Sequence, residues 1–303
     1  MAILVDKKTR VLIQGITGKE GLRALEGMKN YGTKVLAGVT PGKSGQKANG
    51  VPVYDTVAEA LRRHPSTNAS LVVVPAVAVK DAALEAMHSG ILFLNILTEH
   101  VPVGDAATIF AWAKRYDARV VGPSSVGIIS PGRGKIGSIG GNKPEKIFRP
   151  GPVGIISKSG GMTAEIAITL NRAGIGQSTV LGIGGDKIIG SDFVDIMKLF
   201  KNDPGTRAVV VFGEVGGSYE EQLAEFVKKE KFRKPIVAMV AGKFTTKLSL
   251  GTVLGHAGAI VMKGVGGHES KIRALRRAGI SVVNTLEEIP VLLKKKLRGK
   301  IRL

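Results

Sequence analysis

The sequence predicts an α/β fold in which two domains each contain a doubly wound, mostly parallel sheet. Short apolar segments alternate with segments of helical periodicity along nearly the whole chain, the pattern of parallel strands joined by crossover helices. This alternation stops once, at glycine- and proline-rich residues 127–150, and then restarts. The 303 residues suit about two domains of ordinary size. We therefore expect a first domain at 1–126, a linker at 127–150 and a second domain at 151–303.

The first domain's strands are predicted where four to seven mostly apolar residues end at glycine, proline or polar residues. These segments are residues 10–16, 34–40, 51–54, 70–76, 91–97 and 119–125. Helices are predicted where apolar residues recur every three or four positions, at residues 21–32, 56–63, 80–90 and 104–117. Right-handed crossovers through these helices would place every strand in one parallel sheet.

The second domain repeats the pattern with longer apolar segments. Strands are predicted at residues 152–160, 178–185, 207–217 and 234–242, and a strand leading into a helix at 281–289. Helices are predicted at residues 162–173, 192–201 and 220–230. Ligands of such sheets bind beyond the carboxyl ends of the strands, so the loops there are the candidate sites.

Composition excludes several classes of protein. Hydrophobic residues make up 44% of the chain and charged residues 22%, which excludes a wholly disordered protein. There is no cysteine, which excludes disulfides, Cys-ligated zinc or iron–sulfur sites and a thiol nucleophile. No apolar run reaches the roughly 18 residues of a membrane span. The first ten residues carry an acid and three bases, where a signal peptide would need its apolar stretch. We expect a cytoplasmic protein without a membrane partner.

The net charge of +20 would suit a polyanionic ligand or a nucleic acid. The basic residues are scattered, however, apart from a dense run at 294–302. Aromatic residues make up only 5% of the chain, so no platform for stacking bases is apparent. We interpret the charge as a solvated surface and predict no nucleic-acid partner.

A glycine-rich turn, Gly15–Gly21 with the spacing GxxGxxG, joins the first strand to the first helix. Such a turn brings backbone amides to a phosphate at a helix N-terminus, although a plain tight turn would look the same. The second strand ends in GVTPGKSGQK, which contains Thr40, Lys43 and Lys47 but lacks the acid of an NAD site. These loops favour an adenosine ligand with phosphates at both ends, such as coenzyme A, unless Lys43 is merely a surface lysine.

Three loops of the second domain form a candidate catalytic site. Ser159, Gly160 and Gly161 open a helix directly after a strand, which suits an anion or a simple N-cap. Glu214 ends an apolar strand, where it would cap a helix or orient an imidazole. His256 lies among glycines and alanines, which leave room for a large group. Such a histidine is structural, a general base or a nucleophile that forms phosphohistidine. We assign no metal site.

Taken in order, VLIQGITGKEG, AGVTPGK, KIG, LGIGGD, GEVGG and GHAGAI resemble the motifs of one family nearly end to end. The family is the alpha-type, small subunit of acid–CoA ligases, the succinyl-CoA synthetase family. The resemblance implies a Rossmann-like CoA-binding domain followed by a flavodoxin-like ligase domain. It implies CoA contacts at Thr17, Gly18, Lys19, Glu20, Lys43, Leu97, Thr98 and Glu99. It also implies that His256 is phosphorylated, that Glu214 is its partner, and that Ser159, Gly160 and Gly161 begin the helix that holds the phosphate.

The resemblance further implies a two-subunit enzyme. In this family a larger, beta-type ATP-grasp subunit binds ATP or GTP with magnesium, and this sequence has neither a strict Walker loop nor an ATP-grasp pattern. The implied cycle phosphorylates His256, passes the phosphate to a carboxylic acid and lets the CoA thiol attack the acyl phosphate. A more distant alternative is a CoA-binding protein without catalysis.

Three departures bear on the identity of the acid. Residues 159–165 read SGGMTAE where succinate enzymes read SGTLTYE, so Ala164 replaces a tyrosine that meets the substrate. Residues 122–127 read GPSSVG in place of GPNCPG, and FTTKLSLGTVL precedes the histidine. All three resemble ATP-citrate lyase and citryl-CoA synthetase. We therefore favour citrate over succinate as the acid, with an unusual succinate enzyme as the alternative.

Overall fold

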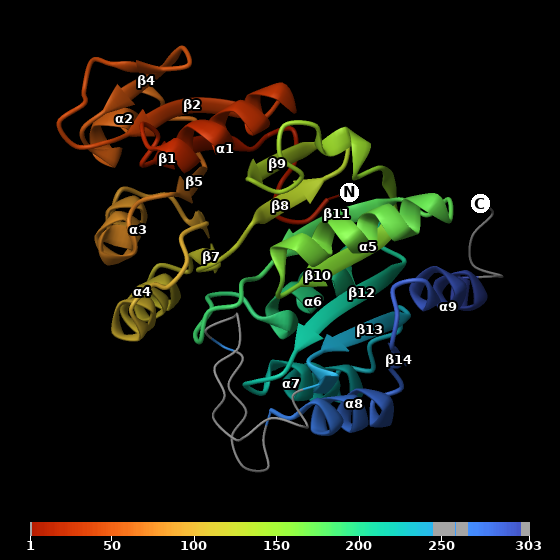
Figure 1. Ribbon diagram of the computed structural model, residues 1–303. Coiled ribbons are helices and arrows are strands. Elements are labelled where there is room, and N and C mark those ends of the chain that lie inside the picture. The colour runs from red at the N-terminus through yellow and green to blue at the C-terminus, as the bar shows by residue number, and fades with distance from the viewer. Residues whose placement is uncertain (1, 245–257, 259–265, 298–303) are drawn as a thin grey trace.

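The computed structural model describes residues 2–244, 258 and 266–297, which form two α/β domains side by side (Figure 1). The first domain contains a seven-stranded sheet in the order β3-β4-β2-β1-β5-β6-β7. Its strands are β1 (Arg10–Gln14), β2 (Lys34–Val39), β3 (Lys47–Ala48), β4 (Val51–Tyr54), β5 (Ala69–Val72), β6 (Phe93–Ile96) and β7 (Arg119–Val121). All pairs are parallel except β3 with β4. Without β3, this is the Rossmann strand order, with its switch point between β1 and β5.

Helices cover both faces of the first sheet. They are α1 (Lys19–Asn30), α2 (Val57–Arg63), α3 (Val79–His88) and α4 (Val103–Arg115), with a short 3₁₀ helix, η1 (Ala76–Ala78). α1 packs its buried residues against one face, while α2, α3 and α4 share a second core on the other. The predicted strands and helices of this domain are confirmed, with ends that differ by a few residues.

The second sheet has the order β14-β13-β12-β10-β11-β8-β9. Its parallel strands are β10 (Pro150–Ser157), β11 (Gln177–Gly182), β12 (Ala208–Glu214), β13 (Ile236–Ala241) and β14 (Ser281–Val283). These five strands have the flavodoxin-like order, whose switch point lies between β10 and β12. The predicted α/β fold class of both domains is therefore confirmed.

Helices also cover both faces of the second sheet. They are α5 (Gly160–Arg172), α6 (Phe193–Asn202), α7 (Tyr219–Lys229), α8 (His268–Arg277) and α9 (Glu288–Leu297). α5 and α9 lie on one face and α6, α7 and α8 on the other. The sequence pattern predicted α5, α6, α7 and the start of α9, but it missed α8.

Residues 127–150 differ from the predicted linker. They contain β8 (Gly127–Ser130), β9 (Gly134–Gly137) and the 3₁₀ helix η2 (Pro144–Lys146). β8 pairs antiparallel with β11, so the β8–β9 hairpin extends the second sheet. The glycines that suggested a linker instead allow close approach of the two strands, because a Cβ at Gly127 would meet the Ile136 carbonyl oxygen at 2.1 Å.

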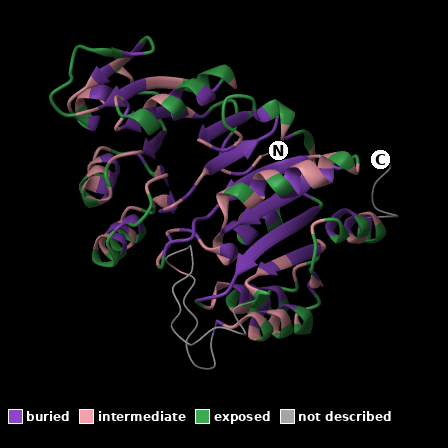
Figure 2. Ribbon diagram, in the orientation of Figure 1, coloured by how far each residue is buried: buried purple, intermediate pink, exposed green. Residues whose placement is uncertain are grey.

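The core runs through both sheets, whose strands are almost entirely buried (Figure 2). One cluster of buried residues continues from beneath α1 through the β8–β9 hairpin to α6, α7 and α8. The two domains therefore share an apolar contact.

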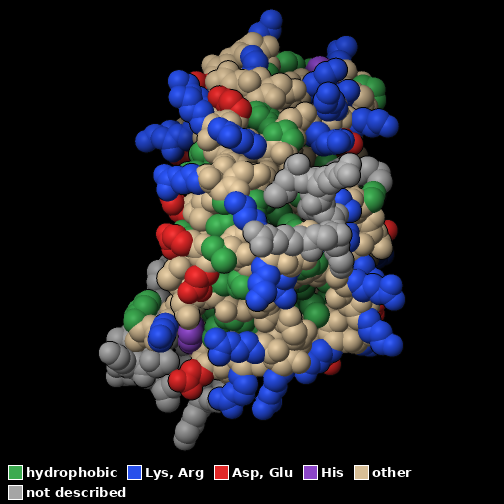
Figure 3. All heavy atoms as spheres, turned by 90° about the vertical axis from the view of Figure 1, so that its right-hand side faces the viewer, with side chains coloured by type: hydrophobic (Ala, Val, Ile, Leu, Met, Phe, Trp, Pro, Cys, Tyr) green, Lys and Arg blue, Asp and Glu red, His purple; other side chains and the backbone are tan. Residues whose placement is uncertain are grey.

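Lys and Arg side chains are spread over the face drawn in Figure 3 and do not gather in one patch. Among the described residues, no helix is both long and apolar enough to cross a membrane.

Lys135 is a fully buried lysine of the β8–β9 hairpin and provides a test of this packing. Its Nζ donates to the Gly141 carbonyl at 2.5 Å and lies beside Gly27 of α1. Burial lowers the pKa of Lys135 to about 8 from 10.5, and Glu145 partly offsets the shift. Between pH 8 and 10.5 the unfolded chain therefore holds a proton that the folded chain does not, so the free energy of unfolding rises with pH.

Lys135→Met removes this titration. We expect the wild type to gain about 3 kcal/mol relative to the variant as the pH rises from 8 to 10.5. Urea unfolding of both proteins across this range measures the difference. Parallel curves for the two proteins would show that Lys135 keeps its ordinary pKa in the folded state.

Candidate functional site

A cavity of about 580 Å³ lies at the switch point of the first sheet. The ends of β1, β2 and β5 and the start of α1 line it, through Gln14, Gly15, Thr17, Gly18, Val39, Thr40, Pro41, Val73, Val74 and neighbouring residues of η1 and α3. Thr17 donates to the Thr40 hydroxyl at 3.2 Å and so joins the two loops. The cavity contains the glycine-rich turn and mostly apolar walls, which fit an adenosine-type ligand whose phosphates meet the turn.

The glycines of this turn have different roles. Gly15 has a φ of +85°, and a Cβ there would meet the Val73 carbonyl oxygen at 2.3 Å. A Cβ at Gly21 would meet the Gly15 oxygen at the same distance, so both glycines are needed for close packing. Gly18 is the N-cap of α1, is exposed and borders the cavity. The turn thus combines tight packing at Gly15 and Gly21 with an exposed helix start at Gly18.

The remaining predicted CoA contacts of the first loops lie on the rim. Lys19 and Glu20 are exposed in the first turn of α1, where Glu20 pairs with Arg23 at 3.0 Å. Lys43 is exposed, and its backbone amide donates to Asp55. None of these three residues lines the cavity, although all are close in sequence to residues that do, so their contacts with CoA stay predictions.

A second cavity, of about 310 Å³, lies between the two domains. It is lined by Leu97, Glu99, Ser124, Ser125 and Val126 of the first domain, by Ser138 after β9, by Lys158, and by Ser159, Gly160 and Gly161, which together are called the anion turn. Thr98 connects the walls of the two cavities. Its hydroxyl donates to the carbonyl of Val74, which lines the first cavity. Its carbonyl accepts from the amide of Ser124, which lines the second cavity. The segment Leu97–Glu99 therefore borders the second cavity and is hydrogen-bonded to a wall residue of the first.

The anion turn follows β10 and begins α5. Ser159 is the N-cap, with extended backbone angles, but its side chain makes no capping hydrogen bond. The Ser157 hydroxyl instead accepts from the Ser159 amide and donates to the Ser159 carbonyl, which fixes the turn. Ser159 is therefore the N-cap by position, but its hydroxyl does not cap the helix. Ser159, Gly160 and Gly161 line the second cavity, so the positive end of the helix dipole lies at this cavity.

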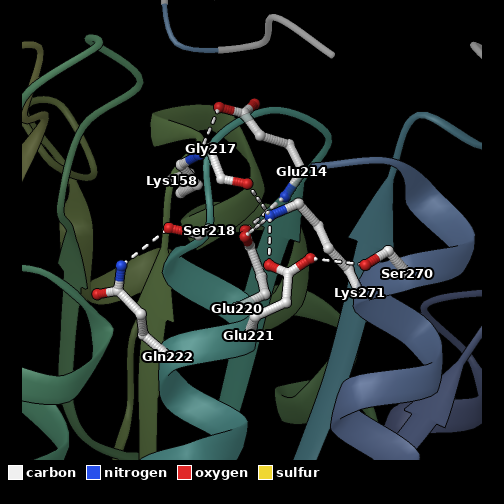
Figure 4. A network of polar contacts seen from close by, with 9 residues as sticks. All are labelled: Lys158, Glu214, Gly217, Ser218, Glu220, Glu221, Gln222, Ser270 and Lys271. Atoms are coloured by element: carbon white, nitrogen blue, oxygen red, sulfur yellow. Dashed lines mark hydrogen bonds and ion pairs between the residues drawn. The ribbon is translucent and has the colours of Figure 1, made fainter. Parts of the chain in front are cut away.

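Glu214 ends β12 at the switch point and is 7% exposed. The Nζ of Lys158, which is 2% exposed, lies 3.4 Å from its Oε1 (Figure 4). Lys158 follows Ser157, which pairs with Phe212 in the sheet, so neighbouring strands bring the two charges together. Lys158 also lies 5.5 Å from the centre of the Tyr219 ring. Among the described residues, Lys158 is thus one ion-pair partner of Glu214, and its sequence context did not predict this contact.

A network of charged residues lies beneath the turn that carries Glu214 (Figure 4). The Glu214 amide donates to Glu220 Oε1 at 3.1 Å, and the other oxygen of Glu220 pairs with Lys271 of α8. Glu220 and Lys271 are fully buried. The sequence pattern missed both, because charged residues on helices are usually solvated.

The motif LGIGGD ends in a loop that touches both domains. Asp186 accepts from the His100 and Val101 amides of the first domain at 3.4 and 3.3 Å, and burial raises the pKa of its carboxyl. Gly185 accepts from the Gly258 amide at 2.9 Å.

His256 is two residues before Gly258 in the sequence and lies outside the described residues, as does most of the FTTKLSLGTVL segment. Ala164 is half-buried on α5 and does not line the second cavity.

Comparisons with known proteins agree with this arrangement. A family model described as a CoA binding domain matches residues 6–100, and one described as CoA-ligase matches residues 156–281. The chain is 48% identical to subunit alpha 2 of the ADP-forming succinate–CoA ligase of Archaeoglobus fulgidus, over 97% of this chain and 99% of that one. It is 43% identical to the alpha subunit of the same enzyme from Aquifex aeolicus, over 98% and 95% of the two chains.

A solved ATP citrate lyase from Methanothrix soehngenii, in complex with citrate and coenzyme A, superposes with a TM-score of 0.89 at 26% identity. The match covers 99% of this chain and 52% of that one, so this chain spans about half of the lyase chain. An acetyl-coenzyme A synthetase of Ca. Korarchaeum cryptofilum, with a TM-score of 0.73 at 20% identity, shares the fold. The predicted family is confirmed: the chain belongs to the succinate–CoA ligase alpha-subunit family and is a ligase subunit with a CoA-binding domain.

Proposed function

We propose that this chain is the CoA-binding, histidine-bearing subunit of a nucleoside-triphosphate-dependent carboxylate–CoA ligase. The observation that carries the proposal is the adjacency of the two cavities along Leu97–Glu99. A CoA bound at the glycine-rich turn would need only to pass this segment for its thiol to reach the anion turn. The family models and the relatives of 40–48% identity support the same activity.

The site residues have separate roles in the proposed cycle. His256 takes the terminal phosphoryl group of ATP or GTP, and Glu214 orients its ring and stabilises the imidazolium. The amides of Ser159–Gly161 and the ammonium of Lys158 hold the phosphoryl oxygens. A carboxylate oxygen of the acid then displaces the histidine from phosphorus. The CoA thiolate attacks the resulting acyl phosphate, so the C–S bond forms as phosphate leaves.

A second subunit completes this proposal. The matching relatives are named as alpha subunits, and the cycle needs a site for Mg-ATP or Mg-GTP. We propose that a beta-type, ATP-grasp subunit supplies that site in a hetero-oligomer. A cytoplasmic location, without nucleic acid or membrane as partner, remains our prediction.

Two acids remain candidates. Succinate is favoured by the names of relatives that match nearly the whole chain at up to 48% identity. Citrate is favoured by the SGGMTAE and GPSSVG loops and by the structural likeness to a citrate-binding lyase. Ser124 of the second cavity offers a hydroxyl group that either acid would use, whereas the buried Ser125 hydroxyl already bonds Gly182, Asn95 and Gly127.

The test is an assay of the chain together with the large subunit that co-purifies with it. With ATP, CoA and either acid, we expect ADP release, an acyl-CoA of the corresponding mass and phosphate on His256. A citryl-CoA product would assign citrate, and succinyl-CoA without citrate turnover would assign succinate. If no acid gives product and His256 carries no phosphate, the chain is a CoA-binding protein and the ligase proposal is wrong.

A further inference from the structure

Lys271 is a lysine in the interior of the second domain, with no exposed surface. Its Nζ pairs with Glu220, lies 3.0 Å from Glu221 Oε2 and donates to the Gly217 carbonyl at 3.0 Å. Two carboxylates and one carbonyl thus surround a single ammonium group (Figure 4). Burial of a charge is costly unless its donors are satisfied, and here three acceptors surround this ammonium.

The network reaches Glu214 through its backbone. Glu220 uses one carboxylate oxygen for Lys271 and the other for the Glu214 amide, at 3.1 Å. Its carboxylate lies so close to the strand that a Cβ at Gly213 would meet Glu220 Oε1 at 2.5 Å. Lys271 holds the far end of the same turn at Gly217. Both ends of the turn after β12 are therefore attached to one ion pair.

The first turn of α8 is attached to the same place. The Gly216 amide donates to the Gly266 carbonyl at 2.8 Å, and Ser270 donates to Glu221 Oε1 at 3.1 Å. α8 follows His256 in the chain by twelve residues. The network thus joins the turn that presents Glu214 to the helix that follows the histidine segment.

We infer that Glu220 and Lys271 are a positioning pair that sets where the Glu214 carboxylate lies for histidine phosphorylation, an inference that rests on the proposed function. Glu220, Lys271 and Glu214 do not line the second cavity, whereas Lys158, which pairs with Glu214, does. The pair is therefore inferred to act through the Glu214 backbone and not by contact with a ligand. The alternative interpretation is that Glu220 and Lys271 only stabilise the second domain and have no effect on the position of Glu214. A buried ion pair is poor support for stability alone, since apolar replacements of similar volume are often neutral.

The inference is tested with Lys271→Met, Lys271→Arg and Glu220→Gln in the complex with the large subunit. Lys135→Met is the matched control, because Lys135 of β9 is equally buried but donates to the Gly141 carbonyl in the loop after β9. The readouts are the single-turnover rate of phosphohistidine formation from ATP, the Kd for CoA and the melting temperature. All rates are measured well below the lowest melting temperature.

We expect Lys271→Met and Glu220→Gln to slow phosphohistidine formation by about 10- to 100-fold, because misplacing a catalytic group by about 1 Å costs of that order. The Kd for CoA should stay within about twofold, and Lys271→Arg should recover part of the rate. If folded Lys271→Met and Glu220→Gln phosphorylate at the wild-type rate, or if Lys135→Met slows the reaction equally, the inference is overturned. If wild type itself forms no phosphohistidine, the proposed function fails first.

Discussion

Replacing Glu214 with Gln should slow phosphorylation of His256 by about 10²- to 10⁴-fold. The amide keeps the size of the side chain but loses the charge that orients an imidazole and stabilises its cation, and carboxylates in this role have effects of that order. Glu214 is well placed for the role, because it ends β12 at the switch point of the sheet and lies beside the anion turn. The measurement is rapid-quench, single-turnover phosphorylation with ATP and the large subunit.

Glu225→Gln is the matched control. Glu225 is an exposed residue of α7, so its substitution removes the same charge from the same domain at a distance from the turn. We expect Glu225→Gln to phosphorylate at the wild-type rate. Glu214→Gln should also bind CoA with the Kd of the wild type, because the cavity proposed to hold CoA belongs to the first domain. Wild-type phosphorylation of Glu214→Gln would show that the carboxylate is not the partner of His256.

The strands were predictable because most of them lie in the interior of parallel sheets. A strand buried on both faces appears as an unbroken apolar run, as in AVVVFGE of β12, all of whose residues are buried. Two of the loops after these strands border cavities, and their role as binding sites stays a prediction. The same argument gave the order of the domains, because each restarts the alternation of strand and helix.

The β8–β9 hairpin and α8 escaped prediction for different reasons. The hairpin is short, rich in glycine and stabilised by β11, which lies some 50 residues further along the chain. α8 buries only Lys271 and Leu275, so it lacks an apolar face in the sequence. The same limit applies to the site. Lys158 looks like a surface residue in SKSGG, and only the neighbouring strand reveals the buried carboxylate that holds it.

Replacing Lys158 with Met should destabilise the protein by about 3–5 kcal/mol, because it removes one partner of a buried ion pair. It should also slow phosphorylation of His256, because the ammonium beside the anion turn is lost as the phosphoryl oxygens arrive. Thermal unfolding measures the first effect and single-turnover phosphorylation the second. Lys198→Met, an exposed lysine of α6, is the control and should change neither by much.

The double variant Glu214→Gln with Lys158→Met separates the two effects. Removing both charges takes away the buried pair as a whole, so part of the lost stability should return, while phosphorylation should stay as slow as in Glu214→Gln or slower. Such a result would mean that the Lys158–Glu214 ion pair is needed for phosphorylation of His256 but not for the stability of the fold. If the double variant is instead less stable than either single variant, the contact between Lys158 and Glu214 is not a coupled ion pair, and each residue is held by separate packing.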